Sequence, residues 1–92
     1  MSQVVEKSFT IINTLGLHAR AATKLVQTAS RFPCDVEVRR DDQAANGKCV
    51  MGVLLLCGSR GTVITVRATG EQADECVTAI GTLVAARFGE ES

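Results

Sequence analysis

The chain has 92 residues, 46% of them hydrophobic and 22% charged, and its ten basic residues balance its ten acidic ones. This length predicts a single domain over residues 1–92, and no apolar run approaches the ~20 residues of a membrane span, so membrane insertion is not expected. The balanced charge and three aromatic residues provide neither a positive field nor a stacking platform, which argues against a nucleic-acid partner.

The cysteines and the N-terminus indicate a reducing compartment. The four cysteines lack C-x-x-C spacing, and one histidine cannot complete a zinc set, so no metal and no cofactor are expected. The first ten residues do not show the basic and then apolar segments of a signal peptide. We therefore expect a cytoplasmic protein with reduced thiols, the alternative being a disulfide set in a secreted protein.

The first half of the chain alternates between strand and helix patterns. Alternating polarity over residues 4–12 predicts a first strand, and apolar steps of three and four residues from position 19 until Pro33 predict a first helix. Residues 34–40 alternate again, and the two aspartates that follow favour a turn, so a hairpin that returns over 43–48 is expected.

The second half adds a short apolar segment, a strand and a long helix. Periodicity alone leaves residues 50–58 open between a strand and a buried helix; we predict a short helix because residues 62–69 make the better strand. Residues 71–89 carry an amphipathic stripe typical of a helix. Its interior Gly81 costs about 1 kcal/mol relative to alanine, which suggests a close approach there, although simple tolerance is the alternative.

The order of predicted elements is βαββαβα, and the helices must bury their apolar stripes on one face of the sheet. If the first two strands are parallel, the fourth fits between them in antiparallel orientation. We therefore predict an α+β open-faced sandwich, in which a mainly antiparallel four-stranded sheet of order 1-4-2-3 is covered on one face by three helices.

His18, the only histidine, lies where the first strand gives way to the first helix. By itself it favours a surface or capping role. At the N-cap position, however, the free N–H groups of Ala19, Arg20 and Ala21 would form an anion site to which the Arg20 side chain adds charge-assisted hydrogen bonds. A neutral imidazole there could accept and release a phosphoryl group.

The rest of the sequence offers no second catalytic group, neither a P-loop nor an acidic cluster suited to Mg²⁺. The chain could therefore carry a phosphoryl group but is not expected to be a stand-alone catalyst. Arg20, Lys24 and Arg31 fall within about 40 degrees on a helical wheel. This stripe is either a solvated face or a docking site for an acidic partner.

Four segments together resemble the histidine-containing phosphocarrier proteins (HPr family) of the bacterial phosphoenolpyruvate phosphotransferase system. They are "GLHARAA", "TKLVQTASRF", "NGKCVMGVLLL" and "GTVITVRATG", and they span nearly the whole chain in order. The resemblance implies an HPr-like open-faced sandwich in which enzyme I phosphorylates His18 on Nδ1. It also implies that IIA-type domains accept the phosphoryl group, for sugar uptake or regulation, and that Arg20 steadies the phosphate.

We expect a monomer. The resemblance further implies that partners dock on the first helix and the short second helix. The residues implied in this docking surface are Ala19, Arg20, Lys24, Val50, Met51, Leu54 and Leu55. An apolar patch with a basic rim suits transient association. Burial is the alternative for Val50 and Leu54.

Two positions depart from the family pattern. Many members have proline where this chain has Ala21, and the usual regulatory serine is here Cys49. Alanine keeps the helix start viable and supplies an N–H that proline lacks. Cys49 cannot take a serine phosphate, and a small helix-capping role is favoured over a reactive thiol.

Two other functions are compatible with the sequence. A nitrogen-type regulator would act by phosphorylation-dependent protein binding, to which the acidic tail adds weak support. A small-molecule-binding α+β domain would use His18 only as a cap.

Overall fold

The computed structural model describes residues 3–92, and within them it contains four strands and three α-helices in the predicted βαββαβα order. The elements are β1 (Gln3–Thr10), α1 (Ala19–Ser30), β2 (Asp35–Arg40), β3 (Gln43–Asn46), α2 (Val50–Leu55), β4 (Val63–Gly70), α3 (Ala73–Ala85) and a 3₁₀ turn, η1 (Arg87–Gly89). The short helix predicted in the middle of the chain is confirmed as α2.

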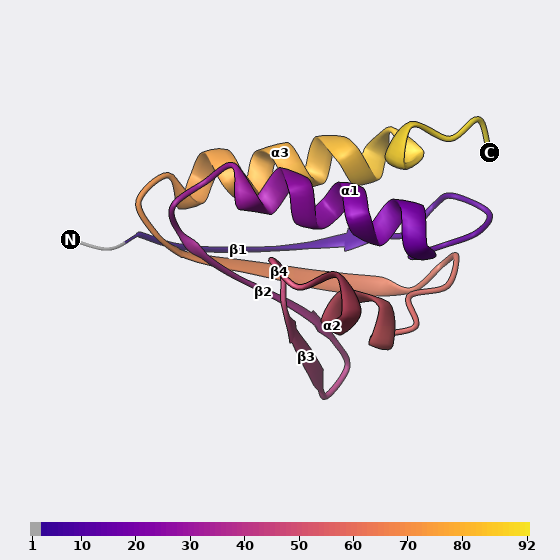
Figure 1. Ribbon diagram of the computed structural model, residues 1–92, viewed down its shortest axis with the longest axis horizontal. Helices are drawn as coiled ribbons and strands as arrows, with labels where there is room; N and C mark the ends of the chain where they lie inside the picture. Colours follow the sequence, from indigo (N-terminus) through magenta and orange to yellow (C-terminus); the bar gives the residue numbers. More distant parts are fainter. Residues whose placement is uncertain (1–2) are drawn as a thin grey trace.

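The strands form one antiparallel sheet in the order β1-β4-β2-β3 (Figure 1). β4 pairs with β1 on one side and with β2 on the other, so β1 and β2 are parallel to each other. Phe9 lies opposite Ile64, and Val38 lies opposite Val66. The predicted order and the predicted antiparallel pairing are therefore confirmed.

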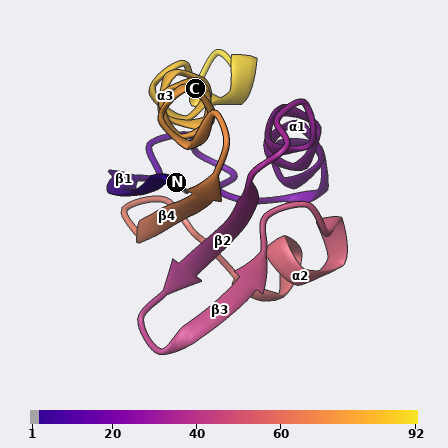
Figure 2. The ribbon, with the colours of Figure 1, turned by 90° about the vertical axis from the view of Figure 1, so that its left-hand side faces the viewer.

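The core lies between this sheet and the helices. α1 and α3 run side by side over the sheet (Figure 2), and α2 packs against α1 and β3. The apolar stripe of α1 and the inward residues of β2 and β4 are buried as their periodicity predicts; they are Ala22, Leu25, Val26, Ala29, Val36, Val38, Ile64, Val66 and Ala68. Within residues 3–92, no helix is long and apolar enough to cross a membrane.

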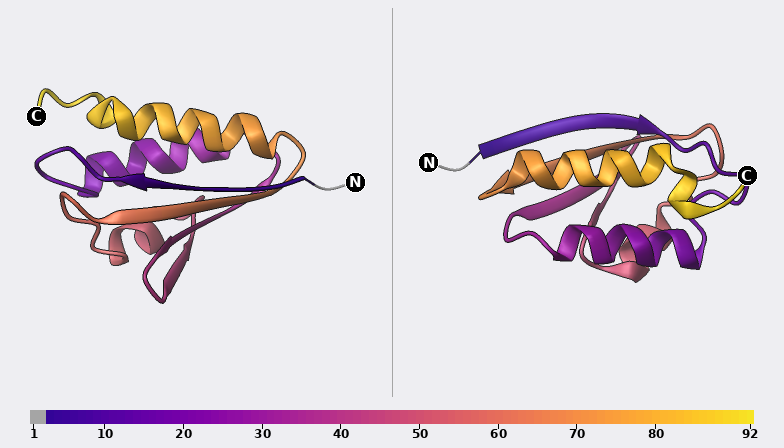
Figure 3. Two further views of the ribbon diagram at one scale, coloured as in Figure 1. Left: turned by 180° about the vertical axis from the view of Figure 1, so that it is seen from behind. Right: turned by 90° about the horizontal axis from the view of Figure 1, so that it is seen from above.

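The start of β1 at Gln3 and the C-terminus lie at opposite ends of the molecule (Figure 3). The last helix is shorter than predicted, because α3 ends at Ala85 and the chain then turns sharply. Arg87 and Phe88 adopt positive φ angles of 56° and 54°, a left-handed conformation that costs a non-glycine residue about 1–3 kcal/mol. The turn brings the C-terminal segment back beside the loop that precedes α1 (Figure 3).

Gly81 in α3 faces the first strand. A Cβ at this position would lie 2.7 Å from Cε1 of Phe9, closer than real Cβ contacts. The close approach predicted from an interior helix glycine is therefore confirmed, and the ring of Phe9 is its cause.

All four cysteines are free thiols, and they fall into two pairs by burial. Cys34 and Cys76 are buried in the core, whereas Cys49 and Cys57 are exposed. Burial, followed by the neighbouring Cys34 thiol, raises the pKa of the Cys76 thiol to about 12. Cys76 therefore acts as a small apolar core residue, since the thiolate is the reactive form.

Candidate functional site

The loop between β1 and α1 is fixed to the loop that follows α2. The N–H of Leu17 donates to the carbonyl of Gly58 at 2.7 Å, and the N–H of Gly61 donates to the carbonyl of Ile11 at 2.7 Å. Leu17 and Ile11 are both buried. These contacts hold the start of α1 at one end of the sheet.

Gly16 makes the turn that leads into α1. Its φ of +67° lies in the left-handed region, and its N–H donates to the carbonyl of Asn13 at 3.1 Å. A Cβ at this position would overlap the Gly58 carbonyl oxygen and would lie 2.9 Å from Cα of Ser59. Both the backbone angle and the available space therefore require glycine here.

His18 is the N-cap residue of α1, as predicted. Its backbone is extended, and its carbonyl accepts the first helical hydrogen bond from the N–H of Ala22 at 2.9 Å. The N–H of Arg20 donates to Nδ1 of the His18 ring at 3.3 Å. The side chain of His18 is 28% exposed, so a partner protein can reach the ring while the loop still orients it.

The C-terminal turn places a carboxylate against the His18 ring. The buried ring of Phe88 anchors the turn in the core, and the Lys24 ammonium donates to the Phe88 carbonyl at 2.7 Å. Glu90 follows, and its Oε2 contacts Nε2 of His18. The other oxygen of Glu90 accepts a 2.9 Å hydrogen bond from Nδ2 of Asn13.

These contacts specify one neutral form of the imidazole. A carboxylate is only an acceptor, so Nε2 of His18 must donate to Glu90, whereas Nδ1 accepts from the Arg20 amide and must carry a lone pair. Hydrogen bonds from His18 and then Asn13, with a smaller contribution from the positive charge of Arg20, hold the pKa of Glu90 below its ordinary value of 4.5. Glu90 is therefore ionised at neutral pH.

Asn13 lies beneath this arrangement and is fully buried. The same Nδ2 that binds Glu90 also donates to the carbonyl of Gly16 at 2.8 Å. It therefore ties the turn before α1 to the C-terminal turn. Neither Asn13 nor Glu90 was predicted from the sequence, because the two residues lie 77 positions apart and no local pattern links them.

The residues at the start of α1 are arranged as an anion site requires. Ala19 and Arg20 are exposed, and the side chain of Ala21 is buried in the core. The first N–H groups of a helix have no intrahelical partner, so the amides of all three residues belong to the positive end of α1. The exposed guanidinium of Arg20 can move toward a bound anion.

The predicted basic stripe on α1 is not a uniform solvated face. Lys24 is half-buried, and its ammonium is used by the C-terminal turn. The guanidinium of Arg31 lies 5.9 Å from the ring centroid of Phe32, near the other end of the helix. Arg20 is thus the cation of the stripe that adjoins His18.

Large apolar side chains are exposed on α2 and in the loop before α1. Met51 and Leu55 of α2 are 64% and 69% exposed, and Leu15 in the loop is 69% exposed. Val50 and Leu54 are half-buried and pack against the core, so for these two residues the alternative of burial is partly correct. Leu15 was missed, because a single apolar residue in a loop carries no periodic signal.

Cys49 is the N-cap residue of α2, but its thiol makes no capping hydrogen bond with any of the described residues. The interpretation of Cys49 as a small helix-capping residue is therefore confirmed in position, and within residues 3–92 its side chain adds no hydrogen bond to the cap. Its thiol is exposed and lies 3.7 Å from where a Cβ on Gly52 would be.

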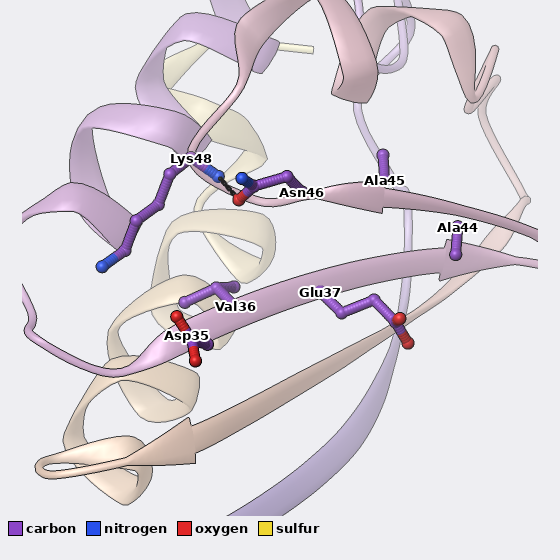
Figure 4. A pocket seen from close by; sticks show the side chains of 7 residues that line it. All are labelled: Asp35, Val36, Glu37, Ala44, Ala45, Asn46 and Lys48. Carbon is purple, nitrogen blue, oxygen red and sulfur yellow. Dashed lines mark hydrogen bonds between the residues drawn. The ribbon is translucent and has the colours of Figure 1, made fainter.

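A hollow lies on the β2–β3 hairpin, away from His18 (Figure 4). It is lined by Asp35, Val36, Glu37, Ala44, Ala45, Asn46 and Lys48. Two of its polar groups are used inside the protein, because Asn46 Oδ1 accepts from the Lys48 N–H at 2.9 Å and the Lys48 ammonium donates to the Phe32 carbonyl at 2.7 Å. It contains none of the residues around His18.

Across residues 3–92, no group of three or more metal-ligating side chains is assembled.

Taken together, an open-faced sandwich and a partly exposed histidine at a helix N-terminus define a small protein that can bind an anion beside a nucleophilic imidazole. Residues 5–86 match the family model "PTS HPr component phosphorylation site". The chain is 42% identical to phosphocarrier protein HPr of Neisseria meningitidis over 95% of this chain and 98% of that protein. It is also 42% identical to phosphocarrier protein NPr of Shewanella violacea, over 96% and 97% of the two chains.

The comparison with solved structures agrees. The crystal structure of HPr from Thermoanaerobacter tengcongensis superposes with a TM-score of 0.92 at 39% identity, covering 96% of this chain and 99% of that one. The chain belongs to the HPr family, and it is a phosphocarrier of the phosphotransferase system.

Replacement of Gly16 by alanine should destabilise the protein by about 2 kcal/mol or more, because it adds overpacking against the loop after α2 to the cost of a positive φ. The matched control is Gly61→Ala, since Gly61 has a φ of +89° but open space around it. This control should cost only about 1 kcal/mol. Urea unfolding followed by circular dichroism measures both, and equal losses would contradict the role assigned to packing.

The Glu90 contact should make stability depend on pH. Because the pKa of Glu90 is lowered in the folded state, its contribution is complete above about pH 4.5 and is lost as the pH falls through the lowered value. Wild type should therefore be more stable than Glu90→Gln at pH 7, and this difference should shrink in acid. Denaturation of both proteins between pH 7 and pH 3 tests this. Glu91→Gln is the control, and a difference that is independent of pH would refute the assignment.

Proposed function

We propose that His18 is the residue that carries the phosphoryl group, on Nδ1, and that residues 1–92 act as one carrier domain. The observation that carries the proposal is the position of His18. Its ring is partly exposed at the N-cap of α1, and Nδ1 is the nitrogen that faces the helix amides. A lone pair on Nδ1 is the nucleophile that phosphoryl acceptance requires.

The transfer step needs alignment and charge neutralisation rather than a catalytic base. The lone pair of Nδ1 attacks phosphorus, the bond to the donor breaks, and the donor leaves with the bonding electrons. The amides of Ala19, Arg20 and Ala21 lie at the positive end of α1, where the phosphoryl oxygens would bind. The guanidinium of Arg20 would then move from solvent onto these oxygens and stabilise their charge.

HPr-family proteins work with enzyme I and with IIA-type components, and we propose enzyme I as the donor and IIA-type domains as the acceptors of this chain. The docking surface would combine the exposed apolar side chains of Leu15, Met51 and Leu55 with Arg20 at its rim. An apolar centre with a charged edge suits an association that must be brief. Lys24 would contribute mainly by holding the C-terminal turn.

Two sequence departures affect regulation more than transfer. Ala21 keeps the backbone N–H that a proline would remove from the anion site. Cys49 at the start of α2 has no hydroxyl to phosphorylate, so control by a serine kinase at this position is not expected. We propose that the chain functions as a cytoplasmic monomer.

A nitrogen-type regulatory role is the second candidate, and the 42% identity to an NPr protein supports it, which equals the identity to HPr of Neisseria meningitidis. In that role the phosphorylation state of His18 would govern association with a regulatory partner. The same surface around His18 would serve both roles, so the acceptor distinguishes them.

Incubation with enzyme I and phosphoenolpyruvate should add one acid-labile phosphate, detected by intact-protein mass spectrometry. The increase should be absent in His18→Ala, and Arg20→Ala should slow it by roughly tenfold or more, since a charge-assisted contact to the transferring group is lost. Arg31→Ala is the matched control, because Arg31 lies near the far end of the helix, and it should be phosphorylated at nearly the wild-type rate.

The same phosphorylated protein can then be mixed with purified sugar-type and nitrogen-type IIA domains. Rapid transfer to a sugar-type domain would establish the transport role, and transfer only to a nitrogen-type domain would establish the regulatory one. If active enzyme I leaves the wild-type protein unlabelled, the carrier assignment of His18 is wrong.

A further inference from the structure

We propose that Glu90 is a positioning residue for phosphoryl transfer, which holds His18 as the tautomer protonated on Nε2 and directs the phosphoryl group to Nδ1. This inference rests on the proposed role of His18. It assigns a function to the C-terminal turn, which lies outside the segment matched by the family model, residues 5–86.

The first support is that the two ring nitrogens of His18 have different hydrogen-bond partners. Glu90 occupies Nε2, and the Arg20 amide faces Nδ1. The two nitrogens point to different sides of the imidazole, so the carboxylate on Nε2 does not block Nδ1. A phosphoryl donor reaches the Nδ1 lone pair by displacing its 3.3 Å contact with the Arg20 amide. Without an acceptor at Nε2, the proton could move to Nδ1, and Nε2 would become the nucleophile.

The second support is that the carboxylate is held from several directions. The Glu90 side chain is only 13% exposed, and its second oxygen is bound by the fully buried Asn13. Upstream, the buried Phe88 and the Lys24 ammonium fix the turn. A terminal segment without such anchors would be free to leave the ring.

The third support is the strain retained in the turn. Arg87 and Phe88 both have left-handed backbones without being glycine. Such residues persist only where the surrounding structure stabilises them, and they concentrate at functional sites. Here their combined effect is to turn the chain after α3 and carry Glu90 to His18.

The charge of the phosphorylated ring explains why a carboxylate, Glu90, lies near a site for phosphate. When Nδ1 of the neutral ring forms its bond to phosphorus, the proton on Nε2 stays in place and the ring becomes a phosphorylated imidazolium. Glu90 provides the counter-charge for that cation. When the group passes to an acceptor, the N–P bond breaks and its electron pair returns to Nδ1. No ring proton has to move in either direction, as with a carboxylate that orients a catalytic histidine.

A small-molecule donor tests this role without any partner protein. Phosphoramidate can phosphorylate an imidazole, its P–N bond breaking as ammonia leaves with the bonding electrons. The variants are Glu90→Gln, which removes the charge, and Glu90→Ala, which removes the acceptor. Glu91→Gln is the matched control, because Glu91 is exposed and adjacent and loses the same charge.

Two readouts are required. Ring ¹⁵N chemical shifts of the unphosphorylated proteins report the tautomer, and ³¹P spectra of the labelled proteins report which nitrogen carries phosphorus. Wild type and Glu91→Gln should hold the proton on Nε2 and phosphorylate on Nδ1. Glu90→Ala should show more of the other tautomer and should gain the Nε2 product. Glu90→Gln keeps an oxygen that accepts from Nε2 and should keep the tautomer. Both variants should be labelled about threefold or more slowly, because the counter-charge is lost.

A wild-type tautomer population and a wild-type product in Glu90→Ala, or wild-type labelling rates in both variants, would overturn the proposal. They would leave Glu90 as an anchor of the tail, a role that changes stability but not the site of phosphorylation. The proposed function fails differently, since it is lost when enzyme I and phosphoenolpyruvate do not label the wild-type protein, whatever phosphoramidate does. Amide spectra confirm that each variant is folded.

Discussion

The placement of one imidazole ring at the N-terminus of α1 is the constraint on which the rest of the structure depends. A helix start offers unpaired N–H groups and a positive end, but it becomes a phosphoryl site only if a nucleophile is held at its edge. His18 meets this requirement as the N-cap residue. The loop before it is tied to the loop after α2, and the sheet and the three helices provide the rigid support for both loops.

Several features that are unfavourable for folding lie around the His18 ring. Gly16 is confined to a left-handed turn against neighbouring backbone, Asn13 is buried completely, and Arg87 and Phe88 are strained. Each feature orders a segment that contacts His18 directly or through one other residue. The core of the sheet, in contrast, is made of ordinary apolar side chains in regular strands. The regular part of the fold therefore supplies most of the stability, and the irregular segments around His18 fix the position of its ring.

The regular part of the fold could be predicted because its signals are periodic. The stripe of α1, the alternation of β2 and β4 and the choice of a short helix at Val50–Leu55 follow from hydrophobic spacing, and all are found in the structure. Gly81 could be interpreted because glycine weakens a helix interior, a cost that is offset where a neighbouring group leaves no room for a Cβ, and Phe9 is that neighbour. The N-cap position of His18 likewise follows from local sequence.

The contacts of the C-terminal turn could not be predicted, because they join distant parts of the chain. Glu90 reaches His18 across 72 residues, and two non-glycine residues in left-handed conformations make the turn that takes it there. Helical periodicity predicted that α3 would continue to residue 89, and it was wrong because tertiary contacts of Phe88 and Lys24 end the helix early. The contact between the Lys24 ammonium and the Phe88 carbonyl could not be predicted for the same reason. Lys24 was therefore assigned to an exposed basic stripe, although it is half-buried.

The most direct single measurement is the identity of the atom that carries phosphorus after turnover with enzyme I and phosphoenolpyruvate. In ¹⁵N-labelled protein, scalar coupling between ³¹P and ¹⁵N identifies that atom without any mutation. We expect one coupling, to Nδ1 of His18, with the proton retained on Nε2. Phosphorus on Nε2, or on a residue other than His18, would contradict the assignment of this ring as the oriented carrier.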